Sequence, residues 1–178
     1  MTTAFRPPTP ERTTIDGPVG PLEALVEVPE DFDGTRCAVV CHPHPLYGGT
    51  LTNKVVHVAA RTLQEAGYAT VRFNFRGVGA SAGTYDEGRG EVDDAGAAAA
   101  YAAARWPGAS LTLAGFSFGA FVAFQLAGRR PVRQLYTIAP PVRRFDFTRH
   151  RVPDAPWVVI QGDADELVDW RDVVAWGE

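Results

Sequence analysis

Apolar residues change their spacing along the chain, and these changes predict an alternation of strands and helices. The β-branched apolar runs at 23–29 and 36–41 flank a turn signal at 30–34 and predict a β-hairpin. From Asn53 the apolar residues recur every three to four positions, which predicts a helix that ends at Gly67, a residue type typical of helix C-termini.

The rest of the chain continues this alternation. A helix is expected at about 91–105, begun by Asp93 or Asp94, and another at 118–127. Short apolar runs predict further strands at 69–75, 110–115, 134–139 and 157–162. This order indicates an α/β protein with a mostly parallel, doubly wound sheet. Ligands of such sheets bind at the carboxyl ends of the strands, so the expected site is built from the loops 42–50, 76–90, 115–119 and 162–169.

The composition is that of an ordinary globular protein, and together with the net charge it limits the classes of partner that can be expected. Of the 178 residues 46% are hydrophobic and 21% are charged, which predicts one domain over residues 1–178, with residues 1–10 mobile. The net charge of −4 argues against nucleic acid as a partner. No apolar run suits a signal peptide or a bilayer, which argues against a membrane partner and favours a cytoplasmic location. Cys37 and Cys41 are expected about 13 Å apart on one strand, too far for a disulfide, as reduced core residues.

Ser117 is the strongest candidate for chemistry. It lies between Gly115 and Gly119, where an apolar strand runs directly into a helix. Such a turn strains the serine, holds its hydroxyl out at a helix N-terminus and needs glycines so that the flanking backbone can approach. The pentapeptide alone could arise by chance in a glycine-rich chain, but its position between a strand and a helix favours a nucleophile.

The loop at 42–50 is the expected oxyanion-hole loop. Proline has no N–H, so within residues 43–46 only His44 and Leu46 can donate a backbone hydrogen bond, and Phe118 would supply the other donor. A metal site at His42 and His44 is disfavoured because no third ligand has suitable spacing, and a purely structural role for the two imidazoles stays open.

An apolar acyl pocket and an acid complete the candidates. Phe116, Leu46 and Tyr47 are expected to line the pocket, with plain packing as the alternative. Asp165, after the strand at 157–162, is the expected triad carboxylate, while Asp163 and Glu166 are interpreted as turn and cap residues.

The glycines after the strand at 69–75 match the spacing of a dinucleotide-binding fingerprint, at Gly77, Gly79 and Ala82. A true fingerprint opens a helix and is followed about 20 residues later by an acid at the end of a second strand, whereas here further glycines and then alanines follow. A nucleotide cofactor is therefore disfavoured.

With these residues together, the chain resembles the α/β-hydrolase superfamily and, more narrowly, small lidless bacterial serine hydrolases related to dienelactone hydrolases. The resemblance runs from about residue 15 to the end through HPHPLYGG, NKVV, RFNFRGVGAS, GEVDDA, AGFSFGA and GDADELV. It implies a triad in the order Ser, Asp, His, with Ser117 and Asp165 as its first two members. It also implies hydrolysis of a small-molecule ester or related acyl substrate through an acyl-enzyme, without a cofactor. Fewer than twenty residues separate the strands expected at 134–139 and 157–162, which leaves no room for a large lid domain, so the site is expected to be open.

The resemblance places the triad histidine a few tens of residues after the acid, but no histidine follows Asp165 in the sequence. The favoured interpretation is that the chain stops before the last strand, the final helix and the histidine, which would leave an uncovered sheet edge and an exposed apolar face. Alternatively His42, His44 or His150 serves as the base, while His57 is expected on a helix surface. A third interpretation is a non-catalytic binding protein of this fold. An uncovered edge also predicts self-association into a homo-oligomer.

Overall fold

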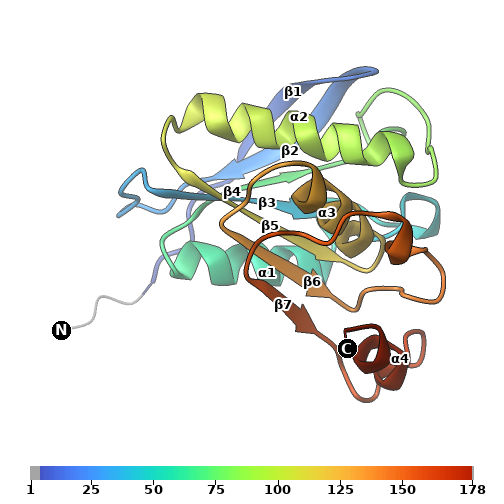
Figure 1. Ribbon diagram of the computed structural model, residues 1–178. Helices are drawn as coiled ribbons and strands as arrows, with labels where there is room; N and C mark the ends of the chain where they lie inside the picture. The colour runs from blue at the N-terminus through green and yellow to red at the C-terminus, as the bar shows by residue number, and fades with distance from the viewer. Residues whose placement is uncertain (1–4, 178) are drawn as a thin grey trace.

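The structure is a computed structural model that describes residues 5–177. Its centre is a seven-stranded sheet in the order β1-β2-β4-β3-β5-β6-β7 (Figure 1). The antiparallel pairs are β1 with β2 and β2 with β4, and all other neighbours are parallel. The strands are β1 (Glu11–Gly17), β2 (Gly20–Glu27), β3 (Arg36–Cys41), β4 (Ala69–Phe73), β5 (Ser110–Phe116), β6 (Gln134–Ile138) and β7 (Trp157–Ile160).

Helices cover both faces of the sheet, as the alternation predicts. The helices α2 and α3 lie on one face and α1 lies on the other, while α4 lies beyond β7 (Figure 1). The helices are α1 (Lys54–Glu65), α2 (Arg89–Arg105), α3 (Phe118–Arg129) and α4 (Trp170–Gly177), with short 3-10 turns at Pro45–Tyr47 and Phe147–Arg149. The expected mostly parallel, doubly wound α/β sheet is therefore confirmed.

Helix α1 illustrates how the sequence produces these elements. The Asn53 side chain accepts hydrogen bonds from the amides of Val55 and Val56 and so begins the helix, and Gly67 has a φ of +84° just after its end. The buried face of α1 includes Val56, Ala60 and Leu63 and packs against β3 and β5. Both expected ends of this helix are confirmed.

The expected hairpin of 23–29 with 36–41 is wrong. Strand β2 instead forms a hairpin with β1, and β3 lies between β4 and β5, parallel to both. Residues 37–41 are fully buried, so β3 needs helices over both of its faces, which the central position provides. Strand β1 was not predicted because only Ile15 of its seven residues is buried, too little for a clear pattern.

Two helix expectations also need correction. Helix α2 begins after Gly88 rather than at Asp93 or Asp94, because the Glu91 carboxylate accepts from the Gly88 amide, while Asp94 is buried and pairs with Arg76. Helix α4 was not predicted at all. The two cysteines are confirmed as free, buried residues.

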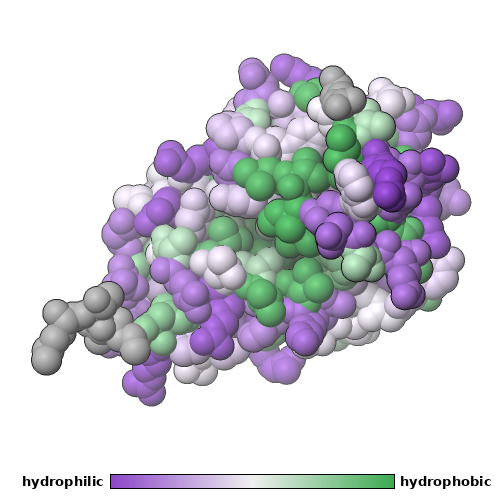
Figure 2. All heavy atoms as spheres, turned by 90° about the horizontal axis from the view of Figure 1, so that it is seen from below, coloured by the Kyte–Doolittle hydropathy of each residue, from purple (hydrophilic) through white to green (hydrophobic). Residues whose placement is uncertain are grey.

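The sheet ends at β7, whose Val158, Val159 and Ile160 are 42%, 37% and 48% exposed. Figure 2, a view from below Figure 1, shows apolar side chains gathered on this side of the molecule. The expected uncovered edge and apolar face are thus present among residues 5–177. Of the segment 1–10 expected to be mobile, residues 1–4 lie outside the described residues, and residues 5–10 form neither helix nor strand.

Candidate active site

Ser117 occupies a sharp turn between β5 and α3. It has φ 53° and ψ −117°, a region that side-chain-bearing residues rarely adopt, and its amide donates to the carbonyl of Ile138 at 2.8 Å. The Ser117 hydroxyl is half-buried and makes no hydrogen bond to any of residues 5–177. A strained backbone therefore presents a free hydroxyl at the carboxyl edge of the sheet.

The two flanking glycines permit this turn by close contact. A Cβ on Gly115 would overlap the carbonyl of Gly119, and a Cβ on Gly119 would overlap the carbonyl of Cys41, where the 42–50 loop begins. The second glycine therefore brings this loop against the start of α3. The physical reason given above for the G-x-S-x-G spacing is confirmed.

The backbone amides near Ser117 differ in whether they are free. Within the described residues, the amides of Phe118 and His44 donate to no acceptor. The Leu46 amide instead donates to Nδ1 of the His44 side chain, at 3.2 Å. Of the two amides expected as alternatives in the loop, only that of His44 is thus available to a ligand.

The imidazole of His42 is fully buried, and both its nitrogens are engaged. Its Nε2 accepts from the Phe75 amide at 3.0 Å, so Nδ1 carries the proton and donates to the Pro43 carbonyl at 2.7 Å. Burial lowers the pKa of His42 to about 4, although the bond to Pro43 acts in the opposite direction. A neutral ring with no free lone pair has a structural role.

The His44 imidazole is engaged as well. Its Nδ1 accepts from Leu46, so Nε2 carries the proton and donates to the Tyr85 hydroxyl at 3.0 Å. Partial burial and the nearby Arg144 charge lower the pKa of His44. Neither His42 nor His44 has a ring nitrogen free to take a proton from Ser117 or to bind a metal. Within residues 5–177 no three His, Cys, Asp or Glu side chains form a metal-binding group.

The two remaining histidines lie elsewhere. The His150 ring packs edge-on against Phe121, with the ring centroids 5.3 Å apart. His57 is exposed on α1, as expected. None of the four histidines is hydrogen bonded to Ser117.

Asp165 lies in the loop after β7, at the same edge of the sheet. Its Oδ1 accepts from the amides of Leu167 and Val168 at 2.8 and 3.0 Å, whereas Oδ2 has only a long contact of 3.4 Å to the Gln161 amide group. Gln161 also donates to the Val168 carbonyl and so holds the loop closed. One carboxylate oxygen is fixed by the backbone and the other is largely free.

The residues expected to line an acyl pocket separate into two groups. Leu46 and Tyr47 are 65% and 77% exposed, and the rings of Tyr47 and His44 lie 4.6 Å apart. Phe116 instead packs with the residues under α1, on the other face of the sheet from α3. The sequence reasoning did not identify Tyr85 and Phe145, whose rings lie 4.9 and 6.1 Å from that of His44.

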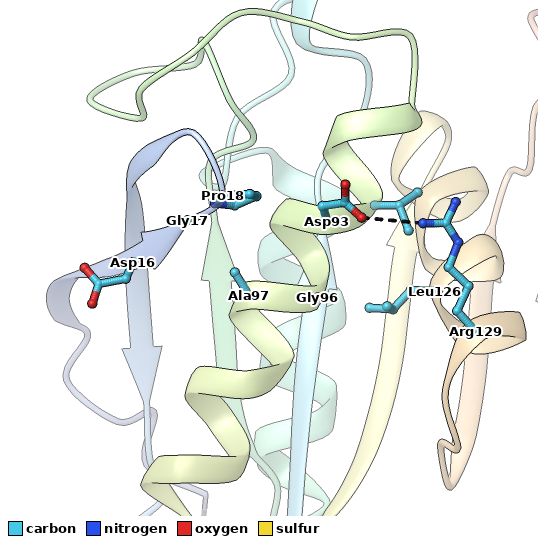
Figure 3. A pocket seen from close by; sticks show the side chains of 9 residues that line it. Asp16, Gly17, Pro18, Asp93, Gly96, Ala97, Leu126 and Arg129 are labelled. Carbon is cyan, nitrogen blue, oxygen red and sulfur yellow. Dashed lines mark ion pairs between the residues drawn. The ribbon is translucent and has the colours of Figure 1, made fainter.

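Two other features do not belong to the group of residues around Ser117. The glycine pattern at Gly77, Gly79 and Ala82 does not open a helix, because α2 begins only at Arg89. A shallow depression of about 400 Å³ lies between the β1–β2 turn, α2 and α3, with an Asp93–Arg129 ion pair of 3.5 Å at its rim. Figure 3 shows the side chains that line it. Arg129 is at the far end of α3 from Ser117, about 18 Å away by helical rise.

None of the helices in residues 5–177 is long and apolar enough for a bilayer crossing.

A sharp serine turn between a strand and a helix at the carboxyl edge of a doubly wound sheet is the arrangement typical of α/β hydrolases. Residues 46–144 match the model of the serine aminopeptidase S33 family. The chain therefore belongs to this family, within the α/β-hydrolase superfamily. The narrower relation to dienelactone hydrolases is not addressed by this match and stays a prediction.

Two solved structures of α/β hydrolases and one further protein sequence are similar to this chain. A protein of Xanthomonas campestris, described as an α/β serine hydrolase without a lid, is 47% identical, with a TM-score of 0.88 over 98% of this chain and 80% of its own. An α/β serine hydrolase homologue of Coxiella burnetii is 44% identical, with a TM-score of 0.90 over 93% of this chain and 80% of its own. An uncharacterised protein of Rickettsia prowazekii is 46% identical over 141 residues, and this match spans 76% of the present chain but only 59% of that relative.

Proposed function

We propose that the protein is a serine hydrolase that cleaves a small carboxylic ester or related acyl compound through an acyl-enzyme. The carrying observation is the free hydroxyl of Ser117, held by a strained backbone beside the unoccupied amides of Phe118 and His44. The family of hydrolases to which the chain belongs supports the same reaction type.

Each residue would have a definite part in the reaction. The Oγ of Ser117 attacks the carbonyl carbon, and the amides of Phe118 and His44 donate to the oxygen that becomes negative. Collapse of this intermediate breaks the ester bond, and the alcohol leaves with the proton that Ser117 gave up. Water then hydrolyses the acyl-enzyme. Asp165, through its free Oδ2, would orient the imidazole that carries the proton between these steps.

None of the four histidines in residues 5–177 lies where it could act as that imidazole. This observation favours a second candidate, a protein of the same fold that binds acyl compounds without turning them over. Removal of triad members in serine hydrolases leaves about 10³–10⁴-fold acceleration over water, from binding and the oxyanion hole. The two candidates therefore differ in the rate at which the bound acyl compound is hydrolysed, and not in the site at which it binds.

A fluorophosphonate probe separates the two candidates. The 178-residue chain is exposed to the probe, the adduct is mapped by mass spectrometry, and Ser117→Ala is the control. Rapid labelling at Ser117 alone, together with hydrolysis of a 4-nitrophenyl ester, supports the hydrolase. A folded chain that is not labelled but still binds a short-chain acyl amide in a calorimetric titration supports the binding protein.

A further inference from the structure

Two buried polar side chains, one in strand β4 and one directly after it, lie where a central strand would be expected to be apolar. Arg72 and Asn74 are 3% and 4% exposed and alternate with Phe73 and Phe75, which are buried in the core under α2 and α3. Burying a polar group is costly unless it is hydrogen bonded. The partners of these two side chains therefore indicate why they are there.

Both side chains bind the same residue of the loop that follows His44. The Leu51 amide donates to Oδ1 of Asn74 at 2.8 Å, and the Leu51 carbonyl accepts from Nη1 of Arg72 at 3.0 Å. Both backbone groups of one loop residue are thus held by the sheet. Leu51 itself is 2% exposed, so these hydrogen bonds are shielded from water.

The two holding side chains are themselves fixed by carboxylates of β2. Glu27 accepts from Nε and Nη2 of Arg72 at 3.0 and 2.8 Å, and this pair is buried. Glu23 accepts from Nδ2 of Asn74 at 2.8 Å. Neither Arg72 nor Asn74 can change its rotamer without losing a charge-assisted hydrogen bond.

The other end of the loop is attached to the same part of the chain. His42 accepts from the amide of Phe75, the residue after Asn74. The segment 42–51, which contains the His44 amide, is therefore held at both ends by residues 72–75. Between the two attachments the amides of Tyr47 and Gly49 donate to the His44 carbonyl at 3.1 and 3.0 Å, so residue 44 is linked to the part of the loop next to Leu51.

We propose that Asn74 is a positioning residue of the active site, which holds Leu51 and thereby fixes the His44 amide relative to Ser117. The inference rests on the proposed function in assigning the His44 amide to the oxyanion. Displacing a reacting group by about 1 Å can cost about a hundredfold in rate, and losing one oxyanion donor about 10²–10³-fold. Loss of the Asn74 bond should therefore reduce the reactivity of Ser117 more than the binding of a ligand.

The test compares Asn74→Leu with Thr70→Val. Leucine has nearly the shape of asparagine but leaves the Leu51 amide without an acceptor. Thr70 lies in β4 and is also fully buried, and its hydroxyl accepts from Gln64 at 2.8 Å and makes no hydrogen bond to the loop 42–51. Thr70→Val removes one buried hydrogen bond, and Asn74→Leu removes the bonds to Leu51 and to Glu23. A merely structural role would lower the free energy of unfolding in both variants without a specific effect on the loop 42–51.

The first readout needs no activity. Hydrogen exchange of the peptides that cover residues 43–51 is followed by mass spectrometry. We expect at least tenfold faster exchange in Asn74→Leu and unchanged exchange in Thr70→Val. Equal exchange of this segment in the two variants would overturn the proposal.

The second readout is the rate at which the fluorophosphonate labels Ser117. We expect a ten- to hundredfold slower rate in Asn74→Leu and a rate within twofold of the wild type in Thr70→Val. Faster exchange with an unchanged labelling rate would overturn the positioning role and leave the hydrolase proposal intact. A wild-type chain that is never labelled would refute the hydrolase proposal, and the exchange data would still decide whether Asn74 holds the loop.

Exchanging the acid and the amide between positions 23 and 74 conserves the net charge and should restore the hold on the loop. In the double variant Glu23→Gln with Asn74→Asp, the new carboxylate accepts from Leu51 and the new amide donates to it, while the exposed Ala80 amide, which donates to Oε2 of Glu23 at 3.0 Å, is left to solvent. We expect this variant to recover slow exchange and most of the labelling rate. Asn74→Asp alone, which places two carboxylates together, should recover less. A double variant as impaired as Asn74→Leu would contradict the assigned hydrogen bonds.

Discussion

Acidification should destabilise the folded chain through His42, and the structure gives the size of the effect. The ring is buried, with Nε2 accepting from Phe75, so a second proton would both charge it and break that hydrogen bond. The pKa of His42 is lowered from 6.5 to about 4 in the folded chain. Between these values the unfolded chain carries a proton that the folded chain lacks, so the free energy of unfolding falls as the pH falls.

Each pH unit in this interval is worth about 1.4 kcal/mol. The contribution of His42 is fully present above pH 6.5 and is lost as the pH falls to about 4, a loss of about 3 kcal/mol. Domains of this size are stable by about 5–15 kcal/mol, so the loss is large enough to measure.

The assay is urea unfolding at several pH values between 4 and 7.5, on the wild type, His42→Gln and His57→Gln. Glutamine can accept from Phe75 and donate to Pro43, but it does not titrate. We expect the free energy of unfolding to depend less on pH in His42→Gln than in the wild type, by about 3 kcal/mol over the interval. The exposed His57 should leave the pH dependence unchanged. Equal pH dependence in all three proteins would refute the assigned protonation state of His42.

Three further predictions concern the serine turn and the sheet edge. Ser117→Gly should raise the free energy of unfolding by about 1 kcal/mol in a denaturation experiment, because glycine relieves the strain at φ 53°, while labelling is abolished. Gly115→Ala should lower the free energy of unfolding by about 1–3 kcal/mol because its Cβ would overlap a carbonyl. As a control, Gly162→Ala, with open space around the residue, should be within about 0.5 kcal/mol of the wild type. Val159→Lys should reduce concentration-dependent association in sedimentation velocity, since charge on an edge strand opposes pairing; a wild type that is monomeric at all concentrations would contradict this.

The serine turn could be predicted from sequence because its requirements are local. A strand, a strained serine, two glycines and a helix follow one another within residues 110–129, and each residue type has a steric reason to be there. The order of the strands was harder to predict from the sequence. Whether β3 pairs with β2 or lies between β4 and β5 depends on contacts distant in sequence, and the turn signal at 30–34 was an insufficient guide.

The choice among donors and bases could not be made from sequence either. His44 and Leu46 were equivalent candidates until the structure placed the Leu46 amide on the His44 ring. Helix α4 was missed because it is short, and only Val173 of its residues is fully buried. Helix α4 is held by a contact between residues distant in sequence, because the ring centroids of Trp176 and Phe147 lie 4.7 Å apart.

The polar residues at the end of β4 and directly after it are a signal that could have been recognised in the sequence. An arginine and an asparagine that alternate with phenylalanines on a buried strand must have partners, because each buried polar group left without one costs about 1–3 kcal/mol. Besides the carboxylates of Glu27 and Glu23 on β2, their partners are backbone groups of the loop beside Ser117. A core built only for stability could replace such residues by apolar ones at little cost. Their position at the end of the strand nearest the serine is therefore better explained by the loop they hold than by the sheet in which they lie.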